Sequence, residues 1–170
     1  MKPNKYQPEV VRTASLLIED ADGKIMVQQR DGGKNENGDP ILNPFRWCMF
    51  GGGIKEGETS EQAMLREVGE ELTIRNQKTG KDTGQLYQPS DYRQVLTMRL
   101  PLQDGRIIEY NVFHTRENIT EDYFYQHEGK NRKFMYESEM EEYDFEPKNK
   151  MVIRESLRQI RQKRGRERTA

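Results

Sequence analysis

The stretch GGIKEGETSEQAMLREVGEELTI, residues Gly52–Ile74, decides how this chain can be interpreted. Its second half predicts a helix over Ser60–Leu72, because no proline interrupts it. Thr59 and Gln62 stand three residues apart at its start and predict a capping box. The three glycines before it, Gly51–Gly53, predict a loop whose backbone can take a positive φ and approach a ligand closely. A glycine loop that leads into a capped helix is thus the centre of the fold.

The two faces of this helix differ in sequence. Its apolar side chains recur at helical spacing and are expected to pack inward: Leu65, Val68 and Leu72. Three carboxylates fall on roughly the opposite side: Glu67, Glu70 and Glu71. Carboxylates grouped in this way repel one another, and a divalent hard cation is the natural partner for their oxygens. A solvated acidic face is the alternative for an arbitrary Glu-rich helix.

The spacing is more specific than the charge. It reads Gly52-x5-Glu58-x7-Arg66-Glu67-Val68-x-Glu70-Glu71-x-Thr73-Ile74 and resembles the Nudix box, Gly-x5-Glu-x7-Arg-Glu-U-x-Glu-Glu-x-Gly-U, in which U is a bulky aliphatic residue. Every specified position matches except Thr73, where the family has a glycine that closes the helix. The resemblance implies an α/β fold, the Nudix α/β/α sandwich, with a mixed β-sheet flanked by helices. It also implies a hydrolase that uses Mg²⁺, with Mn²⁺ as a substitute.

The same resemblance implies roles for individual residues. The metal ligands would be Glu67, Glu70 and Glu71, with the backbone carbonyl of Gly51 as a further ligand. Glu58 is a candidate ligand through a water molecule, and Arg66 would orient the glutamates. Because a β-branched residue reaches a positive φ only at a cost, Thr73 predicts that the turn after the helix differs from that of the family while the metal site survives.

The rest of the chain predicts a sheet with a second helix. Strands are expected at Val10–Glu19, Lys24–Arg30, Phe45–Phe50, Tyr92–Leu100, Arg106–Thr115 and Phe134–Tyr136. Turn residues at 21–23 and 103–105 predict two hairpins, and Asp31–Pro44 predicts a long surface loop. The polar stretch Asn76–Ser90 has no assigned element. A helix is expected over Lys148–Lys163, with four residues on its apolar side: Met151, Val152, Leu157 and Ile160.

The segment after the second hairpin points to a subgroup. Glu128-Gly129, Phe134-Met135 and Phe145-x-Pro147-x-Asn149-x-x-Val152-Ile153 resemble the C-terminal part of the MutT-type nucleoside triphosphate pyrophosphohydrolases. In those enzymes a loop glutamate completes the metal site and an asparagine reads the purine edge. The resemblance makes Glu128 a metal ligand or general base, Asn149 the base reader and Arg30 a phosphate contact. The plainer alternatives are a solvated charge, a residue in the first turn of a helix and a charge at a strand edge.

Other subgroups of the same family stay open. ADP-ribose hydrolases tend to carry a proline about sixteen residues past the box, and dinucleoside polyphosphate hydrolases carry a tyrosine slightly beyond. Pro89 and Tyr92 nearly fit these positions and discriminate neither subgroup, since a loop proline is ordinary turn chemistry. The favoured substrate is therefore a nucleoside triphosphate, oxidised forms included. ADP-ribose or a nucleotide sugar is the alternative substrate, and a nucleotide- or RNA-binding module is the alternative of another class.

Composition bounds the remaining possibilities. The 170 residues predict one domain with a core at about 10–163, and 28 basic against 29 acidic residues exclude a uniformly basic nucleic-acid binder. The arginine-rich C-terminus leaves nucleic acid open, although a frayed, solvated end at Arg164–Ala170 is the simpler expectation. The chain carries no apolar run long enough to span a bilayer and no signal-peptide pattern, which predicts a cytoplasmic protein. Homodimerisation stays open.

A few residues predict no chemistry. Cys48 is expected to be a small buried hydrophobe, because no partner for a cysteine nucleophile is evident. His114 and His127 are expected to be structural. The acidic run Glu137–Glu146 is expected to be a solvated surface.

Overall fold

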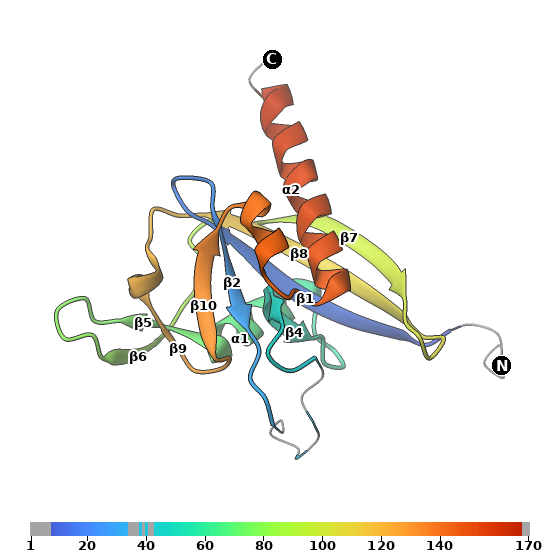
Figure 1. Ribbon diagram of the computed structural model, residues 1–170, viewed down its shortest axis with the longest axis horizontal. Helices are drawn as coiled ribbons and strands as arrows, with labels where there is room; N and C mark the ends of the chain where they lie inside the picture. The colour runs from blue at the N-terminus through green and yellow to red at the C-terminus, as the bar shows by residue number, and fades with distance from the viewer. Residues whose placement is uncertain (1–7, 34–37, 39, 41–42, 168–170) are drawn as a thin grey trace.

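A mixed β-sheet runs through the centre of the protein, between two helices (Figure 1). The computed structural model describes residues 8–33, 38, 40 and 43–167. In that part of the chain the main sheet has the strand order β10-β2-β1-β8-β7, with β3 paired to β2 and β4 paired to β1. Its strands are β1 (Val10–Glu19), β2 (Ile25–Gln29), β3 (Trp47–Cys48), β4 (Phe50–Gly53), β7 (Arg93–Pro101), β8 (Ile107–Arg116) and β10 (Asn131–Met135).

The two predicted hairpins are present and meet in the middle of the sheet. β1 pairs with β2 in antiparallel fashion, and β7 pairs with β8 in the same way. β1 and β8 then join in parallel along their whole length, from Val10 opposite Ile107 to Glu19 opposite Arg116. Most residues of these two strands are buried, including polar ones of β8, because each strand has neighbours on both sides and both faces of the sheet are covered.

Each face of the sheet is covered by one helix, which gives the expected α/β/α sandwich. Helix α1 (Ser60–Glu71) packs on one face, where a core forms around Leu16, Met26, Phe50, Met64, Val68 and Phe113. Helix α2 (Pro147–Glu167) packs on the other, over Leu17, Val27, Met135, Val152, Ile153 and Leu157. The capping box at Thr59 and Gln62 is formed as predicted. Met151 is an exception to the predicted apolar side of α2, because it is 52% exposed.

A second, smaller sheet that the sequence pattern did not predict follows α1, and one of its three strands lies in the polar stretch Asn76–Ser90. Its strands are β6 (Asp82–Leu86), β5 (Leu72–Arg75) and β9 (Phe124–Gln126), in that order. The residues of β6 are exposed, so no apolar alternation marked the strand. Two short 3₁₀ turns, η1 (Glu121–Tyr123) and η2 (Glu137–Glu142), flank β9 and β10.

Two further expectations change in the structure. The glycine segment is the edge strand β4, in register with β1, and not a free loop: Gly51 lies opposite Ser15 and Gly52 opposite Ala14. Helix α2 continues to Glu167, so the predicted fraying at Arg164 is wrong for residues 164–167, while residues 168–170 lie outside the described residues. Of the predicted Asp31–Pro44 loop, residues 34–37, 39 and 41–42 also lie outside them.

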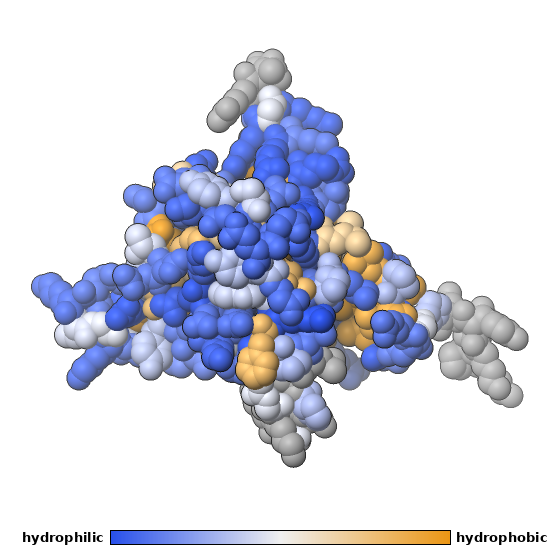
Figure 2. Space-filling view, in the orientation of Figure 1, coloured by the Kyte–Doolittle hydropathy of each residue, from blue (hydrophilic) through white to orange (hydrophobic). Residues whose placement is uncertain are grey.

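The acidic run and the basic helix face each other. Arg154 of α2 forms ion pairs with Glu137 and Glu141, and Arg161 donates to Glu137 at 2.5 Å. The run is therefore not simply a solvated surface, because its carboxylates neutralise part of the charge on α2. Figure 2 shows a mostly hydrophilic face, with apolar side chains gathered over the right-hand part of β7. Within the described ranges, no helix combines the length and the apolar character that a membrane crossing requires.

Candidate active site

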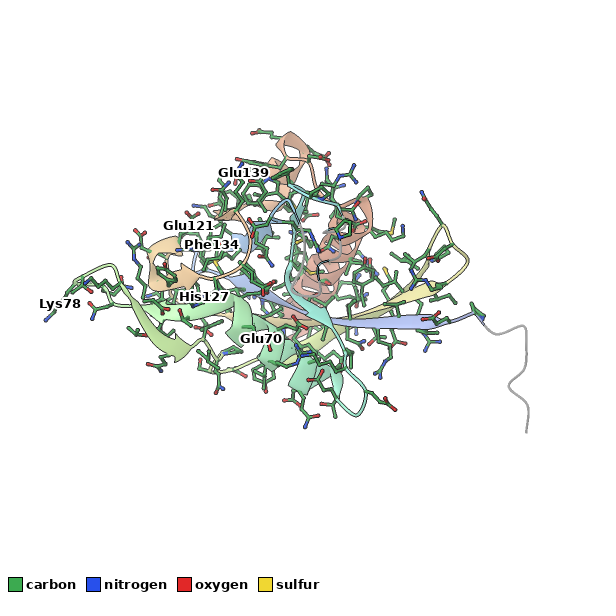
Figure 3. The ribbon with its side chains drawn as sticks, turned by 90° about the horizontal axis from the view of Figure 1, so that it is seen from below. Glu70, Lys78, Glu121, His127, Phe134 and Glu139 are labelled. Carbon is green, nitrogen blue, oxygen red and sulfur yellow. The ribbon has the colours of Figure 1, made fainter. Side chains whose placement is uncertain are left out.

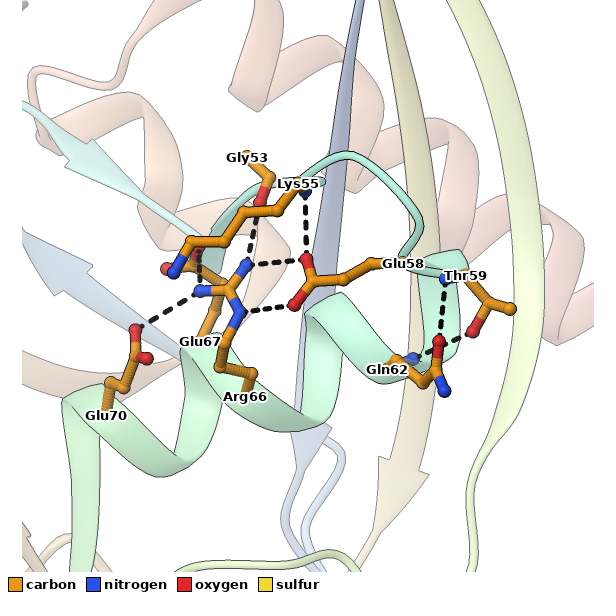
Figure 4. A network of polar contacts seen from close by, with 8 residues as sticks. All are labelled: Gly53, Lys55, Glu58, Thr59, Gln62, Arg66, Glu67 and Glu70. Carbon is orange, nitrogen blue, oxygen red and sulfur yellow. Dashed lines mark hydrogen bonds and ion pairs between the residues drawn. The ribbon is translucent and has the colours of Figure 1, made fainter.

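Arg66 is the centre of a network of polar contacts between α1 and the segment before it (Figure 4). Its Nε and Nη2 atoms donate to the two carboxylate oxygens of Glu58 at 2.6 and 2.9 Å. Its Nη1 atom donates to Glu67 at 2.7 Å and to Glu70 at 3.3 Å. The Nη2 atom also donates to the carbonyl of Gly53 at 3.0 Å. Bidentate arginine–carboxylate pairs fix geometry, so Arg66 determines where three of the predicted site carboxylates lie.

The network has an electrostatic signature at Glu58. Hydrogen bonds from Arg66 lower the pKa of this carboxyl to about 2, with help from the backbone N–H of Lys55. Glu58 therefore stays ionised across the physiological range. It joins the loop before α1 to the middle of the helix.

The glycines before the helix matter for contact and for backbone shape. A Cβ atom on Gly52 would lie 2.4–2.7 Å from the carboxylate atoms of Glu67, so only glycine leaves room for this side chain. Gly51 has a φ of +128°, and a Cβ atom there would lie 2.2 Å from the carbonyl oxygen of Ala14. The glycines allow close contacts within the protein: Gly52 borders a carboxylate, and Gly51 borders β1.

Glu71 lies in a different environment from its neighbours on the helix. Its side chain is buried, whereas the Glu70 side chain is 48% exposed, so the three carboxylates do not share one solvated face. Gln28 donates to one oxygen of Glu71 at 2.5 Å and the Gly51 N–H donates to the other at 2.8 Å. Burial raises the pKa of Glu71 to about 8, against the lowering effect of these two hydrogen bonds.

The charge of Glu128, on the loop between β9 and β10, acts on this buried carboxyl. The charges of Glu128 and Glu67 both add to the raised pKa of Glu71, which brings together carboxylates that are far apart in the sequence. Gln126 of β9 donates to the backbone carbonyl of Glu128 at 2.5 Å and contacts Gln28 at 3.5 Å. Gln126 thus connects the loop that carries Glu128 to Gln28 of β2, which binds the Glu71 side chain.

Gln28 is a site residue that the sequence analysis missed. It follows Met26 on the same face of β2, and both residues are buried. A polar residue at an inward position of an apolar strand was the available signal, because a buried amide needs a buried partner.

Thr73 shows how the chain leaves the helix without the family glycine. The helix ends at Glu71, its C-cap residue Leu72 has extended φ and ψ and begins β5 directly, and Thr73 is the second residue of that strand. Its hydroxyl donates to Asp82 and contacts Nε2 of His127, which also lies 3.3 Å from Asp82. Thr73 is thus an extended strand residue whose hydroxyl binds a residue of β6. Figure 3 shows His127 next to the end of α1. The backbone N–H of His127 donates to the backbone carbonyl of Glu71 at 2.9 Å.

The described residues contain no group of three or more His, Cys, Asp or Glu side chains arranged to hold a metal ion. Arg66 binds Glu67 and Glu70, so these carboxylates point at the guanidinium. The donor chemistry nevertheless fits a hard cation, because the set consists of carboxylate oxygens and Gly52 leaves room beside it for the carboxylate of Glu67.

The two remaining predicted residues are Asn149 and Arg30. The side-chain oxygen of Asn149, in the first turn of α2, accepts from the Met49 N–H at 3.0 Å. Arg30 follows β2, and its N–H donates to the carbonyl of Arg46 at 3.0 Å. The guanidinium of Arg30 acts on the Cys48 thiol, although burial dominates there and raises the pKa of Cys48 to about 12. Cys48 is therefore buried and protonated, as its sequence context predicted.

The residues of the competing subgroups have structural contacts. Pro89 is buried, and the Tyr92 hydroxyl donates to Glu61 at the start of α1 at 2.6 Å. His114 is buried, and its Nε2 atom lies 2.7 Å from a carboxylate oxygen of Glu19.

Comparison with solved structures finds the same fold. MutT from Methanosarcina mazei Go1 superposes with a TM-score of 0.64 at 15% identity, over 91% of this chain and 97% of that one. The NUDIX domain of Shewanella oneidensis NrtR, solved with ADP ribose, has a TM-score of 0.62 at 14% identity, over 93% and 92% of the two chains. The structure described for MutT from Aliivibrio salmonicida and Vibrio cholerae has a TM-score of 0.58 at 17% identity, over 89% and 99%.

A similarity in sequence covers a shorter region. Dihydroneopterin triphosphate diphosphatase of Escherichia coli K12 is 34% identical over 74 residues, 44% of this chain. The matched region spans 42% of the length of that relative. The model of the NUDIX domain matches residues 10–155, which include the glycine strand, α1, the Glu128 loop and the first turns of α2. The chain belongs to the NUDIX domain family.

Proposed function

We propose that this protein hydrolyses the pyrophosphate bond of nucleoside diphosphate derivatives with the help of Mg²⁺ or Mn²⁺. The favoured substrates are nucleoside triphosphates, oxidised forms included, and the products are a nucleoside monophosphate and pyrophosphate. The assignment rests above all on the buried carboxyl of Glu71, held between Gln28 and Gly51 and facing the charges of Glu67 and Glu128. Carboxylates gathered against their mutual repulsion fit a site for a hard cation and a polyphosphate.

The metal ligands in this proposal are the carboxylates of Glu67, Glu70 and Glu71, with the Gly51 carbonyl as a further ligand. Glu58 contributes through a water molecule. A bound divalent ion neutralises phosphate charge and lowers the pKa of a coordinated water. Since Arg66 binds two of these glutamates, it positions them for the ion and compensates their negative charge when no ion is bound.

The protein's own groups supply the proton transfer and the substrate contacts. Glu128 is the candidate general base, because it is exposed, lies on a loop and acts on the Glu71 carboxyl. Arg30 adds positive charge where the phosphates gather. Asn149 keeps its amide N–H donors for a purine edge, since the contact with Met49 uses only its oxygen.

The relative named for dihydroneopterin triphosphate favours a triphosphate with a fused heteroaromatic ring as substrate. A second candidate is a pyrophosphatase for ADP-ribose or a nucleotide sugar, because a protein of the same fold has been solved with ADP ribose. A pure RNA-binding module is less favoured. Arg154 and Arg161 of α2 are already paired with glutamates of the same protein, which weakens their attraction for a phosphate backbone.

The test is an assay of pyrophosphate and phosphate release with and without Mg²⁺ or Mn²⁺. The panel contains the nucleoside triphosphates, their 8-oxo forms, dihydroneopterin triphosphate, ADP-ribose and nucleotide sugars. Metal-dependent pyrophosphate release from triphosphates is the expected result. Preference for ADP-ribose or a sugar nucleotide would replace the proposed substrate and remove the roles of Glu128 and Asn149. Metal-independent binding without turnover would favour the binding module.

A further inference from the structure

Phe45 is an exposed aromatic residue in a strained backbone conformation. Its φ is +63°, a left-handed value that residues with a bulky side chain rarely adopt, and 51% of its surface is exposed. Burial of the ring therefore cannot be what maintains this conformation. Strained residues of this kind persist where the surrounding structure holds them, and they cluster at ligand sites.

The contacts around Phe45 hold both its backbone and its ring. Its N–H donates to the carbonyl of Arg30 at 3.2 Å, and its own carbonyl accepts from the Gln29 side chain at 2.9 Å. The tip of the ring lies against Gly32, where a Cβ atom would come within 2.3 Å of Cζ. The ring is thus fixed at the end of β2, next to the predicted phosphate contact Arg30.

The other neighbour of the ring is the loop that carries Glu128. The ammonium group of Lys130 lies 5.3 Å from the ring centroid, which is a cation–π contact. This loop is tied to the end of β2 by two hydrogen bonds: the Lys130 N–H donates to Gln29 at 2.7 Å, and the Gly129 N–H donates to the side chain of Asp31 at 2.9 Å. The aromatic ring and the lysine therefore lie at the end of β2, beside the loop that carries Glu128.

We propose that Phe45, with Lys130 beside it, is the platform on which the heteroaromatic ring of the substrate stacks. The proposal rests on the proposed function and adds the group that holds the planar end of the substrate. An aromatic ring and a flexible cation accept any flat, polarisable ring, because stacking does not read hydrogen-bonding edges. The platform thus selects for the presence of a planar ring, and the choice among rings is left to the amide of Asn149.

The experiment compares Phe45→Leu with a matched control, Tyr136→Leu. Tyr136 is also exposed, at 44%, and has a lysine over its ring, with Lys24 at 5.2 Å from the centroid, but its φ is an ordinary −72°. Equilibrium binding of α,β-methylene GTP and of inorganic tripolyphosphate is measured for both variants, together with kcat and KM for GTP. Phe45→Tyr keeps the aromatic ring and serves as the conservative variant.

The expected result for Phe45→Leu is a loss of α,β-methylene GTP affinity of roughly tenfold, with a matching rise in KM and a nearly unchanged kcat. Tripolyphosphate, which has no ring, should bind as it does to the unmodified protein. Phe45→Tyr and Tyr136→Leu should both bind the nucleotide normally. Phe45→Gly removes the ring and relieves the positive φ, so it tests the same point if the leucine variant does not fold.

Two outcomes would overturn the platform: normal nucleotide affinity in Phe45→Leu, or an equal loss of affinity for the nucleotide and for tripolyphosphate. If GTP is hydrolysed but its KM is the same in Phe45→Leu and in the unmodified protein, the platform fails and the proposed function stands. If the nucleotide binds through Phe45 without being hydrolysed, the platform stands and the proposed activity fails.

Discussion

The guanidinium of Arg164 donates to both carboxylate oxygens of Glu19, at 2.9 and 2.7 Å, and so joins the last turns of α2 to the end of β1 across 145 positions of sequence. Glu19 is buried and also contacts His114. Neither Glu19 nor Arg164 is a candidate active-site residue. Substitutions in this pair therefore test stability without changing a proposed catalytic group.

Arg164→Met is expected to lower the free energy of unfolding by about 2 kcal/mol, because it removes both guanidinium hydrogen bonds to the buried Glu19 and leaves only the more distant guanidinium of Arg116. The value stays below that of a fully buried pair, since the Arg164 side chain is 30% exposed. Urea unfolding measures the change. Arg158→Met is the matched control: Arg158 pairs with Glu155 on the same helix and is 54% exposed, so a change below about 0.5 kcal/mol is expected. Equal losses in both variants would contradict the role of Arg164.

The same carboxylate predicts a pH dependence. Burial acts to raise the pKa of Glu19, but hydrogen bonds from His114 and Arg164 outweigh it and lower the pKa to about 2 from an ordinary 4.5. A depressed pKa contributes stability that is present above the unfolded value and is lost as the pH falls towards the folded value. The difference in unfolding free energy between the unmodified protein and Glu19→Gln should therefore be large at pH 7 and should shrink between pH 4.5 and 2. A difference that is constant over this window would show that the pKa of Glu19 is not depressed.

Glu71→Gln is expected to reduce turnover by about 100-fold or more while the protein stays folded, since it removes a proposed metal ligand from the centre of the site. Its unfolding free energy should change by no more than about 1 kcal/mol, because glutamine keeps one of the two acceptor contacts. Glu70→Gln, at the exposed end of the network, should lose activity as well. Steady-state kinetics and thermal unfolding measure both variants. Near-normal rates in the two would contradict the assignment of Glu70 and Glu71 as metal ligands.

Gly52→Ala and Gly53→Ala form a pair that differs only in what the added methyl group meets. At Gly52 it collides with the Glu67 carboxylate, whereas nothing lies within 4 Å at Gly53. We expect Gly52→Ala to raise the Mg²⁺ concentration required for half-maximal activity and to lower kcat by about tenfold or more, because small displacements of catalytic groups are costly. Gly53→Ala should behave like the unmodified protein. Metal titrations of activity provide the measurement, and identical curves for the two variants would exclude a role for the position of Glu67.

Asn149→Asp separates the two contacts of this side chain. Aspartate keeps an oxygen acceptor for the Met49 N–H and loses the amide donors, so the fold should be retained while the preference among purine triphosphates changes. Asn149→Ala also loses the acceptor and should cost about 1 kcal/mol of stability. Relative kcat/KM values for GTP, 8-oxo-GTP and ATP report the preference. An unaltered ranking in Asn149→Asp would leave the residue with a structural role alone.

The parts of the fold that were predictable depend on neighbours in sequence. Helix α1, its capping box and both hairpins follow from local patterns, and the contact between Arg66 and Glu70 follows from helical spacing. The spacing of Gly52, Glu58 and Arg66 also named candidate site residues within one continuous segment, where the structure joins Glu58 to Arg66.

The parts that were missed depend on distant segments. Periodicity placed Glu71 on a charged face, but the approach of Gln28 from β2 makes a buried position for it. The small sheet escaped notice because the residues of β6 are exposed and polar. Arg164 looked like part of a frayed end because nothing near it in sequence reveals its partner Glu19.

The parallel pairing of β1 with β8 has a kinetic consequence. Val10 and Ile107 lie opposite each other although 97 positions separate them, and the entropy of closing so long a loop is lost before any contact compensates it. During synthesis β1 can join only its earlier neighbours β2 and β4, and its other edge stays unpaired until residues 107–116 have emerged. We therefore expect slow folding, in which completion of the central sheet limits the rate and the nascent N-terminal half is the stage most exposed to aggregation.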